Sequence, residues 1–590
     1  MLWRNRAGAP MPTRCTTPID LRASTRVAMA LCVLATGVHA QTPSTAAPPL
    51  SNQPGQPPEV ARPGFVPPAP AGLFQLPPAP VSATPSLPSV DASARVQVQR
   101  IAFSGNTVVP TADLDALAAA YTGRTTSLAE IEVLRQKLTR LYVDRGYVNS
   151  GLLLKRADAA SGVVEFDAVE GRLAGIQLHG MERLREGYVT AQLSRPGDGP
   201  LNIDVLRERF QLLLADPLFD RLNARLIPGT QPGEAVLDID VVRAQPYGVT
   251  LFANNYRPVS IGSVGAGASG WVRNLTGFGD VLEGTLQAPT DHGGDVRTAL
   301  AWRMPLNNRG TQLSLAYDRG DSSLVEEPVR ALDIKSRLVS REIGVSQTLY
   351  ETLARKFSIG VNRAFRENRT TLLGEPFSFV QGEPTGETRE RLWRFWQEFA
   401  QRSEVQVIAL RSTFAWGRNN VQPVTDLPAS SSPFPSHSRV WLGQAQFARQ
   451  LMPDGTQFIV RGSVQRSPDR LLALDGMAIG GINTVRGYRE NQIVRDQGHV
   501  LNVELEWPFL RDPEHGLRVV AVPFYDWGRG RNHGEASTSL RSAGLATRLT
   551  WYNLSVDLTL AKRLHQPAEM RDQGSTLQDK GVQLQVSYKF

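Results

Sequence analysis

The chain has 590 residues, of which 41% are hydrophobic, and this length is enough for two to four domains. With 51 glycines and 41 prolines, about one residue in six disfavours helix, which excludes a long all-helical protein. The formal charge of +8 includes five arginines and one aspartate in the first 40 residues, so the remainder is only about +4 and gives no argument for a nucleic-acid partner.

Residues 1–40 have the features of a secretory signal peptide. Several arginines precede an apolar stretch over residues 27–38, and a small-x-small cleavage pattern ends at Ala40. Both cysteines of the chain, Cys15 and Cys32, lie in this segment. Once the signal is removed, the mature chain therefore lacks the residues for thiolate zinc sites, disulfides and thiol catalysis.

A proline-rich linker is predicted over residues 41–95, since residues 41–90 alone contain 15 of the 41 prolines together with many Ser, Ala and Gln. Such a composition cannot bury enough apolar surface to fold, so we expect a disordered or polyproline spacer. After residue 40 no run of 18 apolar residues occurs, and no membrane-spanning helix is predicted.

Two consecutive segments, 96–171 and 172–245, repeat the element order β-α-α-β-β. In the first, Ser127 and Glu130 form a capping box before a helix with apolar residues at helical spacing. The elements predicted there are a strand over 96–104, helices at 111–120 and from 127, and strands near 149–155 and 162–170. In the second they are a strand at 173–178, helices at 184–193 and 203–214, and strands near 220–227 and 235–242.

The remaining residues, 246–590, alternate apolar and polar side chains with period 2, most clearly in the last ten residues. Long alternation of this kind is typical of a membrane β-barrel, and nine of the ten tryptophans lie after residue 270, as expected for interfacial girdles. A soluble β-sandwich would show the same alternation with the faces exchanged. Sixteen strands are predicted, near 247, 262, 278, 296, 311, 337, 353, 389, 403, 437, 456, 499, 516, 538, 552 and 580, with room for one further pair in 368–388.

The long connection 468–498 is the most informative segment, because a glycine-rich run leads there into Val485, Arg486, Gly487 and Tyr488. A later strand carries Phe524, Asp526 and Gly528 on one face. If that face lines the lumen and the loop folds inward, Arg486 can meet Asp526 in a charge-assisted pair. A surface loop with an exposed arginine is the simpler alternative for each motif taken alone.

Together these features resemble the outer-membrane transporters of two-partner secretion, the haemolysin-activator and haemagglutinin-exporter family of the Omp85 superfamily. The order of signal, spacer, two small modules and barrel is similar to theirs over about residues 95–590. The resemblance implies that 96–171 and 172–245 are POTRA domains and that 246–590 is a barrel of about 16 antiparallel strands. It also implies that Val485-Arg486-Gly487-Tyr488 is the tip of an inward-folded translocation loop and that Phe524, Asp526 and Gly528 form its barrel-wall motif.

The resemblance further implies a function in secretion. POTRA domains would bind an unfolded exoprotein of the large β-helical type, which passes through the barrel to the cell surface. Tyr588 and Phe590 would form the terminal signal read by the barrel assembly machinery, and the barrel would contact outer-membrane lipid. Many members begin with a helix that plugs the barrel, whereas the proline-rich segment here shows no helix of useful length.

Other functions remain open alternatives. An assembly factor of the same superfamily shares the loop and wall motifs, although such factors commonly carry three or more POTRA domains. A passive porin would lack the 150-residue segment before the barrel, and a barrel-embedded hydrolase would need a nucleophile, a base and an oxyanion site that are not evident. The chain contains neither a P-loop nor a His-x-x-x-His pair, so no catalytic residue, metal or cofactor is predicted.

Overall fold

The computed structural model describes residues 64–66, 74–75, 95–194, 199–290, 296–422, 424, 433–565, 567, 574 and 576–590. The expected signal peptide, 1–40, and nearly all of the expected linker, 41–95, lie outside these residues. In this described part of the chain, no helix is both long enough and apolar enough to cross a membrane.

The first module packs two helices on a three-stranded sheet with the strand order β3-β6-β5. Helix α2 begins with a complete capping box, in which Ser127 and Glu130 satisfy each other's backbone N–H groups, and it buries Leu134, Leu138 and Tyr142. The elements are β2 (Arg95–Gln97), β3 (Arg100–Ser104), α1 (Thr111–Ala118), η1 (Ala119–Tyr121), β4 (Thr125–Ser127), α2 (Leu128–Asp144), β5 (Gly151–Asp158) and β6 (Val163–Val169).

The single first strand predicted over 96–104 is wrong, because the chain changes partner within it. Strand β2 pairs with β4, which the sequence analysis did not predict, whereas β3 pairs in parallel with β6. Between them, the backbone N–H of Val98 donates to Arg124 and that of Gln99 donates to Gly162. The apolar pattern of the sequence continues across this change of partner, so the pattern gives no sign that one strand ends and another begins.

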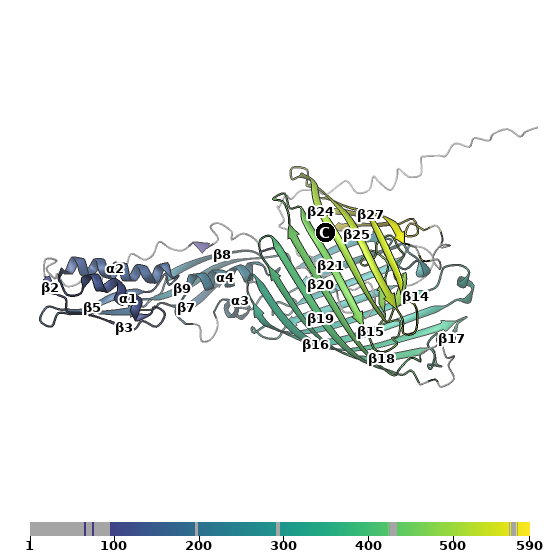
Figure 1. Cartoon of the computed structure of the whole chain (residues 1–590), viewed down its shortest axis with the longest axis horizontal. Helices are drawn as coiled ribbons and strands as arrows, with labels where there is room; N and C mark the ends of the chain where they lie inside the picture. The colour runs from purple at the N-terminus through teal and green to yellow at the C-terminus, as the bar shows by residue number, and fades with distance from the viewer. Residues whose placement is uncertain are drawn as a thin grey trace, which may run out of the picture. The chain divides into compact units, whose positions relative to one another are not determined.

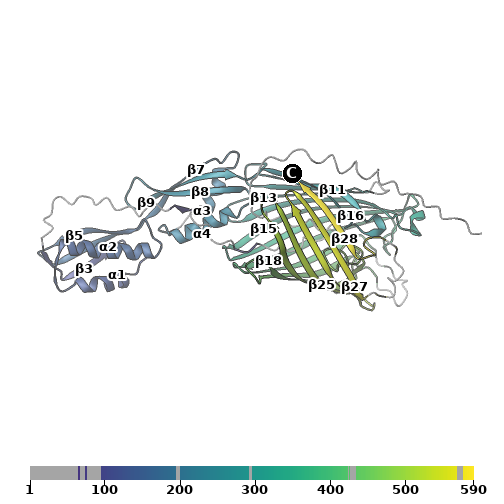
Figure 2. The ribbon, with the colours of Figure 1, turned by 90° about the horizontal axis from the view of Figure 1, so that it is seen from above.

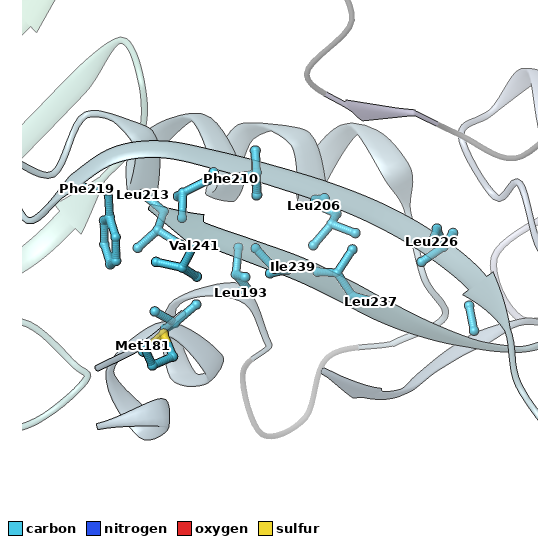
Figure 3. Close-up of a cluster of buried hydrophobic side chains, with 14 of the residues drawn as sticks. Met181, Leu193, Leu206, Phe210, Leu213, Phe219, Leu226, Leu237, Ile239 and Val241 are labelled. Carbon is cyan, nitrogen blue, oxygen red and sulfur yellow. The ribbon is translucent and has the colours of Figure 1, made fainter. Parts of the chain in front are cut away.

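The second module repeats the predicted order β-α-α-β-β, with Asn202 capping its longer helix. Its buried side chains gather into one cluster between the strands and both helices (Figure 3). Its sheet has the order β1-β8-β9-β7, in which the two-residue strand β1 comes from the expected linker. The elements are β1 (Phe74–Gln75), β7 (Arg172–His179), α3 (Glu186–Leu193), α4 (Ile203–Leu214), β8 (Phe219–Pro228) and β9 (Glu234–Arg243).

The rest of the chain forms a closed antiparallel barrel (Figures 1 and 2). Neighbours in sequence pair with each other, and β28 closes the barrel by pairing with both β27 and β10. The predicted sixteen strands are confirmed, and the stretch 368–388 adds only the two-residue β17 (Glu375–Pro376). The sixteen are β10 (Tyr247–Asn254), β11 (Gly265–Arg273), β12 (Val281–Pro289), β13 (Arg297–Pro305), β14 (Thr311–Ser323), β15 (Lys335–Glu351), β16 (Arg355–Leu372), β18 (Glu387–Arg402), β19 (Gln406–Asn419), β20 (His437–Gln450), β21 (Gln457–Arg466), β24 (Gln497–Asp512), β25 (Leu517–Arg531), β26 (Thr538–Trp551), β27 (Leu554–His565) and β28 (Val582–Lys589).

The two ends of the barrel differ in the length of their connections. At the end where β10 begins, the turns are short, as at 352–354, 403–405 and 552–553. At the other end the connections are longer, as at 373–386 and 467–496. Short periplasmic turns and long extracellular loops are the usual asymmetry of outer-membrane barrels, so the long connections mark the extracellular end.

Candidate functional site inside the barrel

The connection between β21 and β24, residues 467–496, folds back against the inner wall. It contains a small hairpin of β22 (Met477–Ile479) and β23 (Ile493–Arg495). A Cβ placed on Gly528 or Gly530 of β25 would come within 2.5 Å or 3.1 Å of Ile479, so hairpin and wall are in close contact. The apolar part of this contact comprises Met477, Ile479, Val485, Tyr488 and Ile493 of the loop with Val500 and Leu540 of the wall.

Arg486 at the loop tip and Asp526 on β25 form a buried bidentate ion pair. Nε of Arg486 lies 2.7 Å from Oδ2 of Asp526 and Nη2 lies 2.7 Å from Oδ1, while the backbone N–H of Arg486 also donates to Oδ2 at 3.0 Å. The side chains are 6% and 0% exposed. A paired guanidinium and carboxylate shielded from water in this geometry form one of the stronger polar contacts available to a protein.

The other two residues of the wall motif have separate structural roles. The ring of Phe524 lies beneath the Arg486 guanidinium, with 3.6 Å between the guanidinium carbon and the ring centre, which adds a cation–π contact. Gly528 leaves space for the loop, since a Cβ there would also lie 2.9 Å from Cγ2 of Val485. Because side chains alternate along β25, Phe524, Asp526 and Gly528 thus lie on the same face of the strand.

Two further residues of the wall, on β24, complete this site, and the sequence analysis did not single them out. Oε1 of Glu504 lies 2.8 Å from Nη2 of Arg486, and Glu504 also pairs with Arg461 on β21. Asn502 donates to Oδ1 of Asp526 at 2.7 Å. Asn502 and Glu504 alternate with apolar Leu501, Val503 and Leu505 in the sequence, and this alternation was the available signal for their position in the lumen.

Gly487 and Tyr488 fix the loop tip to β26, β27 and β28. Gly487 has φ = 84°, and a Cβ on it would lie 2.6 Å from Cβ of Ala561, so only glycine fits without displacement. Its carbonyl accepts from Nε of Arg563 at 2.6 Å. Tyr488 is 1% exposed, and its hydroxyl contacts the backbone carbonyls of Arg541 and His565.

The base of the loop is held at a different part of the wall. Oδ1 of Asp475 lies 2.7 Å from Nη1 of Arg366 on β16, and Oε2 of Glu390 on β18 lies 3.3 Å from the same nitrogen. The exposed fractions of the Arg366, Glu390 and Asp475 side chains are 1%, 1% and 6%. Five strands separate β16 from β25 in one direction around the barrel and nine in the other, so the loop is tied across the lumen.

A third set of contacts ties the loop to the connection that precedes β28 and to the one between β14 and β15. Nε of Arg489 lies 2.6 Å from Oδ1 of Asp579, and Nη1 of Arg489 lies 2.8 Å from Oε1 of Glu326. The backbone N–H of Glu490 donates to Gln578 at 2.9 Å, and its carboxylate accepts from the backbone N–H of Ile482 at 2.6 Å. Loop opening would therefore have to break several polar contacts together.

The terminal aromatic residues lie at the closing seam of the barrel, away from the loop tip. Tyr588 stands opposite Leu251 on one side and Leu554 on the other. The backbone N–H of Phe590 donates to Val249 at 2.8 Å, and its ring, 60% exposed, lies 4.8 Å from that of Tyr588. These two residues are thus accessible from outside the barrel.

The contacts of this site are non-covalent. Its groups are carboxylates paired with guanidinium groups, together with glycines that permit close approach. In the described part of the chain, no group of three or more His, Cys, Asp or Glu is arranged to hold a metal ion.

Comparison with protein families gives two matches. Residues 233–550 match the family described as "Haemolysin secretion/activation protein ShlB/FhaC/HecB". Residues 96–171 match the POTRA domain of ShlB type. The first match covers more than half of the chain, and the second coincides with the first α/β module.

Individual relatives agree with these matches. The outer membrane transporter CdiB of Dickeya dadantii is 23% identical over 486 residues, covering 80% of this chain and 83% of that protein. The hemolysin transporter protein ShlB of Serratia marcescens is 27% identical over 208 residues, covering 34% of this chain and 35% of that protein. Among solved structures, CdiB from Escherichia coli aligns with a TM-score of 0.64 and 20% identity, over 86% of this chain and 93% of that one, which shows a shared fold.

Proposed function

Since this chain belongs to the haemolysin secretion/activation family, we propose that its inward-folded loop is a latch that shapes the path of an exported protein through the barrel. The chain is an outer-membrane translocator of two-partner secretion, with its POTRA region in the periplasm. Its partner is a secreted exoprotein. The assembly-factor alternative has less support, because the matched family and the named relatives are transporters.

The observation that carries the proposal is the buried pair of Arg486 and Asp526. A 30-residue connection is too long to hold one position inside a lumen by chain stiffness, so it needs fixed contacts. The ion pair supplies such a contact. Glu504 pairs with Arg486 as well, and it also neutralises the nearby guanidinium of Arg461. In our proposal, Val485, Arg486, Gly487 and Tyr488 form the latch, and Phe524, Asp526 and Gly528 form its seat.

The two α/β modules, 96–171 and 172–245, act in our proposal as a pair of POTRA domains that capture the unfolded exoprotein. A sheet edge can bind an extended segment by adding it as a further strand. Strand β8 supports this mode of binding, because its free edge already pairs with a short segment from outside the module. Phe74 and Gln75 pair with it in parallel, opposite Ala224 and Arg225. The proposed exoprotein is of the large β-helical type, and Tyr588 and Phe590 are proposed to be recognised by the assembly machinery.

A secretion assay in cells that produce the cognate exoprotein tests the latch. Arg486→Gln should reduce the exoprotein in the medium strongly while the barrel stays assembled, as judged by heat-modifiable migration on gels. Arg495→Gln is the matched control: this arginine lies in the same loop, but it donates to the backbone carbonyl of its neighbour Val494 and pairs with no carboxylate among the described residues. Equal secretion by the Arg486 variant and the wild type would contradict the proposal.

A further inference from the structure

The outer face of the barrel near its extracellular end carries two arginines directly opposite each other. Arg391 on β18 and Arg418 on β19 are paired in register, and both side chains are exposed. Like charges at directly opposed positions of a sheet destabilise it. Among the described residues, neither guanidinium has an ion pair or hydrogen bond, so the pair lacks the anion that would offset its repulsion.

A cleft of about 340 Å³ opens beside this pair on β19, β20 and β21. Three of its nine lining residues are aromatic, and these three, Phe414, Trp416 and Trp441, lie on the outer face. Arg439 stands opposite Trp416 in register and Arg466 opposite Trp441, so each arginine lies on the same face as the tryptophan opposite it. The cleft therefore combines an apolar wall with a cationic rim.

The two features form one surface, which we call the arginine–tryptophan patch: Arg391, Arg418, Arg466, Trp416 and Trp441. Arg418 follows Trp416 by two residues on β19, so both side chains lie on the outer face. Figure 1 shows β18, β19, β20 and β21 side by side in the barrel wall. Arg439 is not counted in the patch because it already has an ion pair, with its Nε 3.3 Å from Oδ2 of Asp469. Arg466, in contrast, has no ion pair among the described residues.

The position of the patch along the strands places it at the level of lipid headgroups. Arg418 and Arg466 lie at or next to the extracellular ends of β19 and β21. An outward-facing arginine is costly at the bilayer midplane, and this cost falls towards zero near the interface. Tryptophans concentrate at the same depth, because the ring is apolar and the indole N–H is polar.

We propose that the arginine–tryptophan patch binds a phosphorylated, acylated lipid of the outer leaflet. A phosphate between Arg391 and Arg418 neutralises two opposed charges with charge-assisted hydrogen bonds. An acyl chain of the same molecule fills the cleft against Trp416 and Trp441, with Arg466 at its rim. A free anion would satisfy the arginines but leave the aromatic cleft unfilled, which favours a lipid.

Native mass spectrometry of the purified full-length protein in detergent tests this proposal, with bisphosphorylated lipid A as the probe. We expect saturable binding of lipid A to the wild type. Arg391→Gln, Arg418→Gln and Arg466→Gln should each weaken it about fivefold. Arg449→Gln is the matched control, because Arg449 is an exposed residue at the opposite end of β20, has no ion pair among the described residues and faces outward as Arg439 does.

Three results would overturn the proposal: undiminished binding of lipid A by the patch variants, displacement of lipid A by equimolar inorganic phosphate, or equally tight binding of phosphatidylglycerol. Displacement by phosphate would show a simple anion site, and tight phosphatidylglycerol binding would remove the assignment to the outer leaflet. Heat-modifiable migration checks that each variant is folded, and three independent substitutions keep the test decisive if one fails to assemble.

Discussion

Gly528 lies so close to Ile479 that a side chain at residue 528 would collide with the loop: a Cβ there would be 2.5 Å from Cγ2 of Ile479. The side chain of Ile479 in the loop hairpin therefore packs directly against the backbone of the barrel wall. This contact explains why glycine stands two residues after Asp526, on the same face of β25. It also makes the fit of the loop sensitive to a single methyl group.

Gly528→Ala should shift the loop away from its seat while leaving the barrel intact. Overpacking of this kind costs about 1–3 kcal/mol, which corresponds to a change of about 5- to 150-fold in the population of the seated loop. Secretion of the exoprotein should fall, and protease should cut the loop faster. Gly462→Ala is the control, since a Cβ at that position has Val500 O, 3.8 Å away, as its nearest neighbour. Equal protease sensitivity of the two variants would be evidence against the contact.

Asp475→Asn should loosen the base of the loop without affecting the tip. The change removes one of the two carboxylates on Arg366 and leaves Glu390, so a loss of about 1–3 kcal/mol in loop attachment is expected. Hydrogen exchange should increase around residue 475 more than around residue 486. Asp469→Asn is the control in the same loop, because its partner Arg439 is 65% exposed and an exposed pair contributes little. Unchanged exchange in the Asp475 variant would show that the second attachment is dispensable.

The sequence alone was sufficient for the sixteen strands, because alternation with period 2 is repeated and each short turn interrupts it. It was also sufficient to bring Arg486 and Asp526 together as a hypothesis, since both motifs are short and distinctive. The contact between Asp475 and Arg366 was not predictable, because these residues are 109 positions apart and neither lies in a distinctive pattern. Alternation places Glu504 on the lumen face but does not show which loop residue it meets.

Glu170→Gln should destabilise the first POTRA module in a pH-dependent way. Burial acts to raise the pKa of Glu170, but hydrogen bonds from Thr107, Val108 and Tyr142 outweigh it and hold the pKa below its ordinary value of 4.5. A carboxyl group with a lowered pKa in the folded state stabilises the fold above its unfolded pKa, and this stabilisation is lost as the pH falls through the folded pKa. The wild type should therefore exceed the variant in stability at neutral pH, and the difference should vanish in acid.

The measurement is hydrogen exchange of the Thr107 and Val108 amides, comparing wild type and variant at each pH. Glu165→Gln is the control in the same module, since the Glu165 carboxylate makes no hydrogen bond among the described residues. A constant difference between wild type and the Glu170 variant at all pH values would contradict the assigned role of the carboxylate.

Phe590→Ala should slow assembly of the barrel. The variant keeps the backbone hydrogen bond to Val249 but loses the ring that makes an edge-to-face contact with Tyr588. If the terminal ring is the feature that the assembly machinery recognises, less protein should reach the heat-modifiable folded form. Tyr247→Ala is the control, because Tyr247 is also 60% exposed and lies on the adjacent β10. Equal folded fractions in the two variants would refute the proposed signal.

In our proposal, Arg486 and Asp526 act on secretion through their contact with each other. Arg486→Ala leaves Asp526 as a buried unpaired charge, at a cost of about 3–5 kcal/mol to the seated loop, whereas Asp526→Ala leaves Arg486 with Glu504 as its remaining carboxylate. Arg486→Ala and Asp526→Ala should therefore each abolish most secretion while the barrel still assembles. Residues that act through one interaction give non-additive effects when changed together.

The decisive measurement is exoprotein secretion by the two single variants and the double variant, normalised to assembled barrel. We expect the double variant to secrete no less than the worse of the two single variants. Multiplicative losses in the double variant, or normal secretion by either single variant, would contradict the latch.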